Sequence, residues 1–215
     1  MLRTLQRPRF YWVTRSLHLY LGLFISPFVV LFSVSVFFMV HPWLPGGAAR
    51  GDSPAEIRTG LRVPPDLQQL ENRERVDALR GVLDQMRVAG EIGLVQHLPK
   101  QHRLRMAVSV PGRETTVVLD YQQGQAEVSS RSTGLADALI YLHKAPGPHL
   151  AAIRGNWAPM RAWRWLADAT VYLLLFITAS GIYLWATIRA QRVPGLCLLA
   201  AGAVSFFGLV YALSY

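Results

Sequence analysis

The chain has 215 residues, of which 52% are hydrophobic and 16% are charged, and its formal net charge is +9 at pH 7. The apolar residues are concentrated in three blocks with almost no charge, Ser16–Val40, Leu166–Ile188 and Pro194–Tyr215, each long enough to cross a bilayer. Because the positive charge is divided between the flanks of these blocks and the long middle section, the composition argues against a nucleic-acid-binding protein, and the single cysteine, Cys197, excludes an internal disulfide.

Residues 1–15 form a basic tail in which arginines alternate with aromatic residues. Such a segment is typical of the headgroup zone of a membrane. Residues 16–41 then predict the first transmembrane helix, which is too long for a removable signal peptide and lacks its small-residue cleavage site. The helix is expected to end at His41, because the residue before Pro42 is pushed out of helical geometry.

His18 lies near the start of this helix and is followed at four-residue steps by Gly22 and Ser26. The spacing predicts that the three share one face. An ionisable side chain inside a membrane segment usually faces a cavity or a partner, and small residues beside it leave room for a flat ligand or a close helix. The alternative is a small-residue packing seam, with the imidazole reaching toward water at the interface.

The short basic flanks predict the orientation of the chain. Arginines are frequent in residues 1–15 and in the loop 189–193. Short positive segments stay in the cytoplasm, whereas sections longer than about 60 residues cross the membrane largely regardless of charge. The N-terminus is therefore expected in the cytoplasm, and residues 42–162 and the C-terminus outside it.

The middle section predicts a loop over residues 42–65 and a small α+β domain over residues 66–130. Apolar residues at three- and four-residue spacing indicate a helix from Asp66 to Val88. Short alternating runs separated by turn residues then indicate an antiparallel sheet, with strands at Ile92–Leu98, Leu104–Val110, Thr115–Leu119 and Gln125–Ser129. His97 and His102 flank one of its turns and are expected to be solvated rather than to bind a metal.

Residues 131–164 form a polar collar before the second apolar block. A short helix at Thr133–Leu142 is expected to end at His143, and a Pro-Gly-Pro turn separates it from His149. Three arginines then alternate with tryptophans: Arg154, Arg161 and Arg164. One interpretation is an ordinary interfacial belt. Arginines and lysines are usually concentrated on the cytoplasmic side of a membrane, however, so a cluster of arginines on the outer side needs an explanation. Binding of an anion, such as a cofactor carboxylate or an acidic substrate, would provide it.

The C-terminal part predicts two further transmembrane helices, at residues 165–188 and 194–215. Asp168 near the start of the first is expected to pair with Arg164, four residues earlier. The last helix carries no charged or histidine side chain and is interpreted as packing material.

Histidines at two depths of the membrane, with arginines beside them, fit b-type haem, because imidazole is a standard axial ligand and haem propionates favour cations at the water interface. His18 is the only histidine expected on the cytoplasmic side, about 35 Å from His41 along the helix, so a second ligand there would come from a twofold homodimer. On the outer side the ligands available are His41, His143 and His149. Arg15 would serve the inner haem, and Arg154, Arg161 and Arg164 the outer one.

Three motifs resemble a known family. Ser16–Leu23, with the sequence SLHLYLGL, resembles the opening of the PepSY-associated transmembrane proteins, and Ser180–Trp185, with the sequence SGIYLW, resembles a second signature of that family. Residues 66–130, with Asp120 followed by Gly124, are similar to a single PepSY domain. The family includes inner-membrane reductases of ferric siderophores that carry haem on histidines of their membrane helices. The resemblance therefore implies His18 and His143 as the leading ligands of haem iron.

The sequence as a whole predicts a membrane α-helical protein, with three transmembrane helices and a small α+β periplasmic PepSY-like domain. The expected function is that of a bacterial inner-membrane haem b protein that passes electrons from an unidentified donor to periplasmic ferric iron or a ferric siderophore. The alternative is a non-enzymatic, membrane-anchored PepSY module that binds or regulates a partner or serves a transporter.

Overall fold

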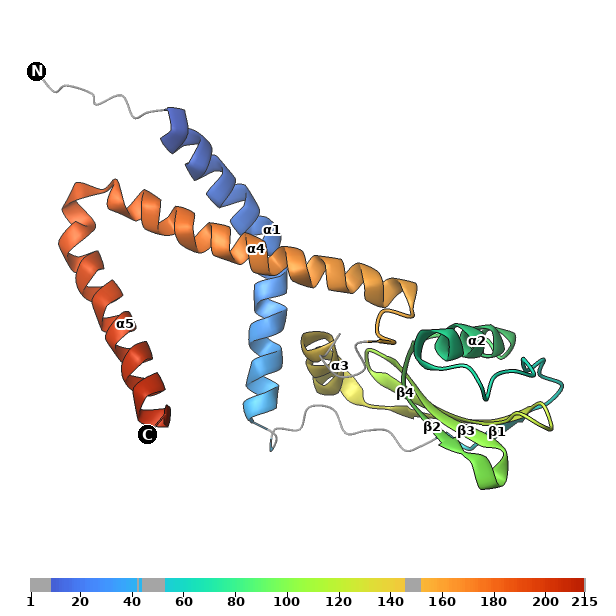
Figure 1. The fold of residues 1–215 in the computed structure, drawn as a ribbon. Coiled ribbons are helices and arrows are strands. Elements are labelled where there is room, and N and C mark those ends of the chain that lie inside the picture. The colour runs from blue at the N-terminus through green and yellow to red at the C-terminus, as the bar shows by residue number, and fades with distance from the viewer. Residues whose placement is uncertain (1–8, 42, 44–52, 146–151, 215) are drawn as a thin grey trace, which may run out of the picture. The chain divides into compact units, whose positions relative to one another are not determined.

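The computed structural model describes residues 9–41, 43, 53–145 and 152–214. It confirms the predicted fold class, since it contains three helices long and apolar enough to span a membrane together with a small antiparallel sheet domain (Figure 1). The chain divides into two compact units. One comprises Met1–Pro27 with Ala169–Tyr215, and the other comprises Phe28–Asp168.

The three membrane helices are α1 (Arg9–Val40), α4 (Ala158–Ala186) and α5 (Arg192–Ser214). Both α1 and α4 begin earlier than the apolar blocks predict, because their aromatic and cationic flanks continue the helix. Pro159 is compatible with the first turn of α4, where its missing N–H has no helical acceptor. A 3-10 turn at Arg189–Gln191 connects α4 to α5.

Pro27 lies inside α1, at the boundary between the two units. A proline cannot donate the backbone hydrogen bond to the carbonyl four residues earlier, which here belongs to Leu23. The Ser26 hydroxyl donates to that carbonyl at 2.9 Å. This replacement explains how α1 tolerates a proline in an apolar environment.

The sheet domain contains five antiparallel strands in the order β1-β5-β4-β3-β2. The strands are β1 (Glu56–Arg58), β2 (Glu91–Leu98), β3 (Arg103–Val110), β4 (Arg113–Asp120) and β5 (Gln125–Ser132). Strands β2 to β5 follow the predicted hairpins. Strand β1 lies in the segment predicted as loop, and its register pairs Ile57 with Glu127 of β5.

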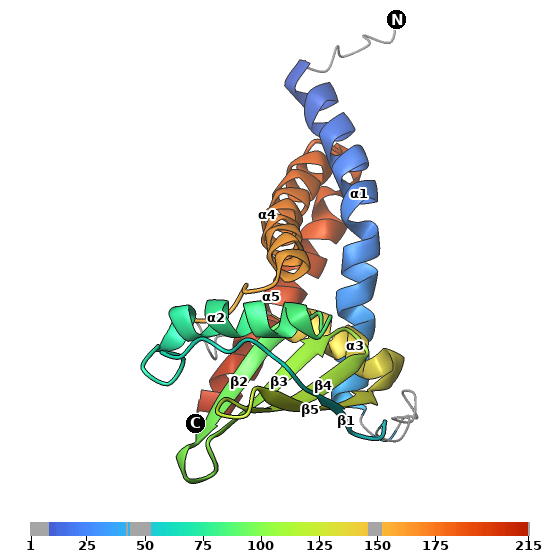
Figure 2. The ribbon, with the colours of Figure 1, turned by 90° about the vertical axis from the view of Figure 1, so that its right-hand side faces the viewer.

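Helix α2 (Asn72–Gln85) packs on one face of this sheet (Figure 2). Alternate residues of β3 and β4 point toward the helix and are buried, including Leu104, Met106 and Leu119. They meet the buried face of α2, which includes Leu79 and Leu83. Helix α2 is shorter than the helix predicted from Asp66 to Val88, because residues 65–69 form turns before it begins.

The turn between β4 and β5 is built from the Asp and Gly that carry the resemblance to PepSY domains. One carboxylate oxygen of Asp120 accepts the backbone N–H groups of Gln122 and Gln123, at 3.1 and 2.9 Å. Gly124 follows with a φ of +61°. A Cβ at this position would lie 2.7 Å from the carbonyl oxygen of Leu61, so a larger residue would displace the segment between β1 and α2.

Candidate functional site: two serine-bound histidines

His18 of α1 is hydrogen-bonded to a serine of α4. Its Nδ1 lies 2.8 Å from Oγ of Ser180, which is only 5% exposed. The Ser180 hydroxyl donates its single hydrogen to the carbonyl of Ile177 at 3.1 Å. It therefore accepts from the imidazole, so that His18 carries its proton on Nδ1.

Glycines bring α1 and α4 together around this pair. A Cβ at Gly181 would lie 3.4 Å from Cε1 of His18, and a Cβ at Gly22 would lie 3.7 Å from the Ile177 side chain. Gly22 therefore allows the close approach of a neighbouring helix, which was one of the two roles expected of the small residues after His18, and the glycine beside the His18 ring is Gly181. The prediction of a shared face is wrong for Ser26, which is exposed and bonds to its own helix. Two four-residue steps rotate a residue by about 80° on a helix of 3.6 residues per turn, which removes Ser26 from the face of His18.

His143 has an equivalent arrangement in the other compact unit. It lies near the end of α3 (Gly134–Lys144), and its Nδ1 is 2.8 Å from Oγ of Ser35 in α1. Ser35 is fully buried, and its hydroxyl donates to the carbonyl of Phe32 at 2.6 Å. The hydroxyl therefore accepts from Nδ1–H of His143, as Ser180 does from His18.

Aromatic side chains hold the His143 ring. Phe32 meets it edge to face, with ring centroids 5.3 Å apart. Trp163 of α4 lies 6.1 Å from Phe32 and donates its indole N–H to the carbonyl of Leu142 at 2.9 Å. The end of α3, and with it the position of His143, is thus fixed by contacts with α1 and with the beginning of α4.

The two serines impose the same chemistry on the two histidines. In each imidazole Nδ1–H is fixed by a hydroxyl that has no other hydrogen to offer, and Nε2 forms no hydrogen bond with any residue that the structure describes. A neutral imidazole with an orienting partner on one nitrogen and a free lone pair on the other is the form in which histidine binds metals.

The other predicted histidine ligands are held differently. His41 at the end of α1 bonds through Nδ1 to the carbonyl of Phe37 at 2.9 Å and lies between the rings of Phe37 and Trp43. His149 lies outside the described residues. Within the described ranges, no three histidine, cysteine, aspartate or glutamate side chains gather in a metal-binding group. His97 and His102 both adjoin Tyr121 and are exposed, as expected for solvated residues.

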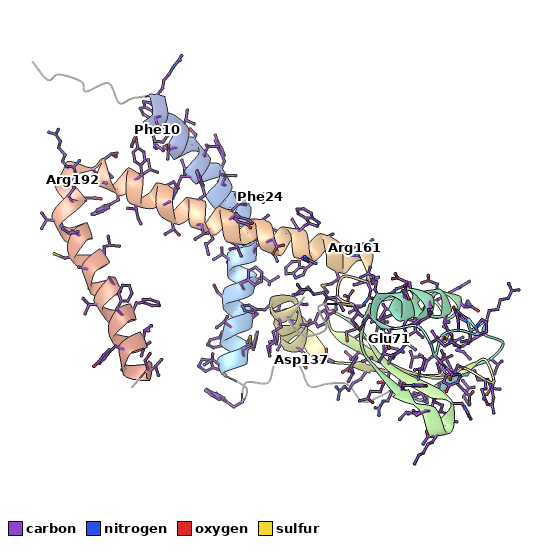
Figure 3. The ribbon with its side chains drawn as sticks, viewed as in Figure 1. Phe10, Phe24, Glu71, Asp137, Arg161 and Arg192 are labelled. Atoms are coloured by element: carbon purple, nitrogen blue, oxygen red, sulfur yellow. The ribbon has the colours of Figure 1, made fainter. Side chains whose placement is uncertain are left out.

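The predicted arginines lie close in sequence to these histidines. Arg15 precedes His18 on α1, is exposed, and has its guanidinium 5.5 Å from the centroid of the Trp12 ring. Arg161 (Figure 3) and Arg164 are exposed in the first turns of α4, and Arg154 is partly buried just before it. The expected ion pair between Arg164 and Asp168 is wrong, because the ion pairs among the described residues all lie in residues 56–131.

One set of interactions was not predicted from the sequence. Glu91, the first residue of β2, accepts the consecutive backbone N–H groups of Gly155, Asn156 and Trp157, just before α4. The Asn156 side chain bonds to both backbone groups of Ile92, at 2.9 Å to its N–H and 2.8 Å to its carbonyl. We call Glu91 and Asn156 the latch, because together they tie β2 to the start of α4.

Two further groups adjoin the latch. The Asn156 carbonyl oxygen Oδ1 also accepts from the guanidinium of Arg80 in α2. Burial raises the pKa of Tyr141 in α3 to about 12, and the negative charge of Glu91 acts in the same direction. No sequence motif signals the latch, since it joins residues more than sixty positions apart through backbone groups.

Comparison with known proteins gives one match. A family model described as "Putative PepSY_TM-like" matches residues 12–213. The chain belongs to the PepSY_TM-like family. This result confirms the resemblance drawn from the motifs around His18 and Ser180. No curated protein and no solved structure matches the chain.

The matched range of the PepSY_TM-like family includes both serine–histidine pairs and the latch. As a test of fit to haem, the described residues supply a suitable ligand atom, Nε2, in each of the two units. Each serine–histidine pair contains one imidazole, and among the described residues no second histidine is bonded to that ring. The donor chemistry therefore fits an axial ligand of haem iron, and the second axial position requires another source.

Proposed function

We propose that this PepSY_TM-like membrane protein binds haem b through Nε2 of His18 and of His143 and passes electrons across the membrane. The observation that carries the proposal is the shared hydrogen-bond pattern of the two imidazoles. Each ring donates Nδ1–H to a serine whose own hydrogen is committed to a helix carbonyl. Such partners fix the tautomer and the ring orientation of metal-bound histidines.

Haem would supply the one-electron chemistry, and the protein would bind it, orient it and set its potential. Arg15 lies one turn before His18 on α1, where its cation is available to a propionate. Arg161 and Arg164 are exposed near Trp163, which positions the end of α3. The exposed outer arginines would serve the second haem, with Arg154 beside them.

Each proposed haem needs a second axial ligand, and the source of that ligand differs between His18 and His143. The unit that contains His18 holds no other histidine, since the remaining five of the chain's six lie at positions 41, 97, 102, 143 and 149. We assign the second ligand of His18 to a second copy of the chain, in a twofold homodimer. The second ligand of His143 would be His41 or His149 of the same chain.

The acceptor and the orientation are part of the same proposal. The arginines of residues 1–15 and of the α4–α5 loop favour a bacterial inner membrane with the N-terminus in the cytoplasm and the sheet domain in the periplasm. Electrons would then move outward to ferric iron or a ferric siderophore, from a donor outside this chain.

The direct test is the haem content of the protein purified in detergent from haem-replete cells, measured by the pyridine haemochrome assay. We expect a Soret band and a reducible α band in the wild type, and loss of haem in His18→Ala and in His143→Ala. His97→Ala is the matched control, because His97 is an exposed histidine of the sheet domain. A colourless wild-type protein would reject the proposal, and unchanged haem in both variants would reject the ligand assignment.

Two further variants separate ligation from packing. Ser35→Ala and Ser180→Ala keep each imidazole but remove its partner on Nδ1. Loss of such a partner typically lowers metal affinity by about 10- to 100-fold. We therefore expect weaker haem retention and a shifted reduction potential, whereas a serine that only fills space would leave the potential unchanged.

The second candidate is a non-enzymatic module that binds a partner through the sheet domain. The latch favours it, since it ties β2 of this domain to residues 155–157, just before α4. The serines would then satisfy partly buried imidazoles and hold the helices together. A colourless wild-type protein whose folding is weakened by His18→Ala and by His143→Ala would support this function.

A further inference from the structure

The sheet domain contains a cavity of about 240 Å³ beside the edge strand β2. Its walls are formed by the start of α2, by β2 and by the segment that leads into α4. Most of the lining side chains are apolar: Val76, Leu94, Val95, Ala152 and Ile153. The cavity lies entirely within one compact unit.

Arg75 of α2 is the charged member of this lining. Its Nε is buried and has no hydrogen-bond partner. Within the described ranges its guanidinium forms no ion pair either, although Glu71 lies one turn earlier on the same face. The Nε of Arg80 is also buried and unpaired, but its guanidinium donates through Nη2 to the side chain and the backbone carbonyl of Asn156. A buried N–H left unpaired is destabilising, so an acceptor inside the cavity would stabilise the Nε–H of Arg75.

We infer that this cavity binds a carboxylate with a short apolar tail, either a free acid or the C-terminus of a peptide. A guanidinium matches a carboxylate through two parallel hydrogen bonds, and the apolar walls accommodate the tail. At roughly 30 Å³ for each water-sized group, the volume holds about eight non-hydrogen atoms. Hexanoate has this size and chemistry.

Binding at this site would connect two parts of the unit. Arg75 belongs to α2, whereas Ile153 belongs to the segment before α4 and packs in the domain core. Arg73 of α2 also donates to the carbonyl of Arg154 at 3.3 Å. A ligand between Arg75 and Ile153 would therefore stabilise the segment that the latch holds. This inference does not depend on haem.

The experiment is a titration of the full-length protein in detergent with hexanoate, followed by calorimetry and by thermal unfolding. The probes for comparison are 1-hexanol, which keeps the tail, and acetate, which keeps the charge. We expect saturable binding of hexanoate, a raised unfolding temperature, and binding of both comparison probes that is at least about 10-fold weaker. Arg75→Gln should weaken hexanoate binding by at least about 10-fold.

Two variants control for indirect effects. Arg113→Gln removes an exposed arginine that does not line the cavity, and it should bind hexanoate as the wild type does. Hexanoate enters the detergent micelles to the same extent with either arginine variant, so a difference in binding between the two variants reports the protein site. Ala152→Leu reduces the cavity from an exposed position and should also weaken binding, even if Arg75→Gln fails to fold.

The source of the carboxylate is distinguished with N-acetyl-glycyl-valine and its C-terminal amide. Tighter binding of the peptide acid than of hexanoate would assign the site to a peptide terminus, and the reverse would assign it to a free acid. Hexanoate binding unaffected by Arg75→Gln, equal affinity for 1-hexanol, or no saturable binding of either acid would overturn the inference. None of these outcomes depends on whether the protein contains haem.

Discussion

Serine hydroxyls fix the tautomer and the ring orientation of the two candidate haem ligands, His18 and His143. His18 and His143 were predicted from the sequence, because histidine is rare in or beside membrane helices and is usually functional there. Their partners Ser180 and Ser35 were not predicted. A serine in a membrane helix more often bonds to its own helix, and a single sequence does not show which residues of two helices meet.

The side chain of Asn156 joins three other residues in the sheet domain. Its amide bonds to Ile92, Ile153 and Arg80. Removing it would leave several partly buried groups unpaired at once, each costing about 1–3 kcal/mol if water cannot replace the bond.

We therefore predict that Asn156→Ala lowers the free energy of unfolding of the sheet domain by about 2–3 kcal/mol. The measurement is denaturant unfolding in detergent, with hydrogen exchange at the Ile92 amide as a local readout. Gln122→Ala, which changes an exposed turn residue, is the control. Unfolding of Asn156→Ala at the wild-type denaturant concentration would contradict the role assigned to the latch.

At the level of helices and strands, the regular parts of the chain were predictable and their ends were not. Alternation indicated β2 to β5, because one face of this sheet is buried against α2. Strand β1 was missed, since three exposed residues show no pattern. The early start of α1 and α4 was missed because arginine and tryptophan are acceptable in a helix but end an apolar block.

The turn between α4 and α5 depends on one glycine. A Cβ at Gly195 would clash with Nε1 of Trp185, whose indole donates to the carbonyl of Gln191 at 2.9 Å. Any side chain at this position must displace the indole and break that hydrogen bond. Overpacking of this kind typically costs about 1–3 kcal/mol.

Gly195→Ala is therefore expected to lower the unfolding temperature of the protein in detergent. Gly202→Ala, in the middle of α5, has open space around the new methyl group and should be neutral or slightly stabilising. Thermal unfolding of the two variants measures the difference. Equal unfolding temperatures for Gly195→Ala and Gly202→Ala would contradict the close contact between Gly195 and the Trp185 indole.

The whole molecule consists of two units that share two helices, with one boundary at Pro27 in α1 and the other between Asp168 and Ala169 in α4. The architecture of membrane helices and a sheet domain was predictable from composition, because apolar length and alternation are strong signals. Within the unit Phe28–Asp168, the joining of the helices to the sheet domain was not predictable, since it rests on Glu91, Asn156 and the Ser35–His143 pair.

The orientation of the chain can be tested with single-cysteine variants in a Cys197→Ser background. We expect Gln101→Cys, in the sheet domain, to react with a membrane-impermeant maleimide added to cells whose outer membrane is permeabilised. Ala190→Cys, in the short basic loop between α4 and α5, should react only after the inner membrane is disrupted. The reverse pattern would show that the sheet domain faces the cytoplasm.

The Asn156 side chain also has a consequence for self-association. Its amide group has the same donor and acceptor as a peptide bond, and it occupies both backbone groups of Ile92 as a neighbouring strand would. Exposed sheet edges are common starting points for aggregation. This single amide ends hydrogen bonding at one end of β2, so another chain cannot extend the sheet from Ile92, even where the protein is crowded in its membrane.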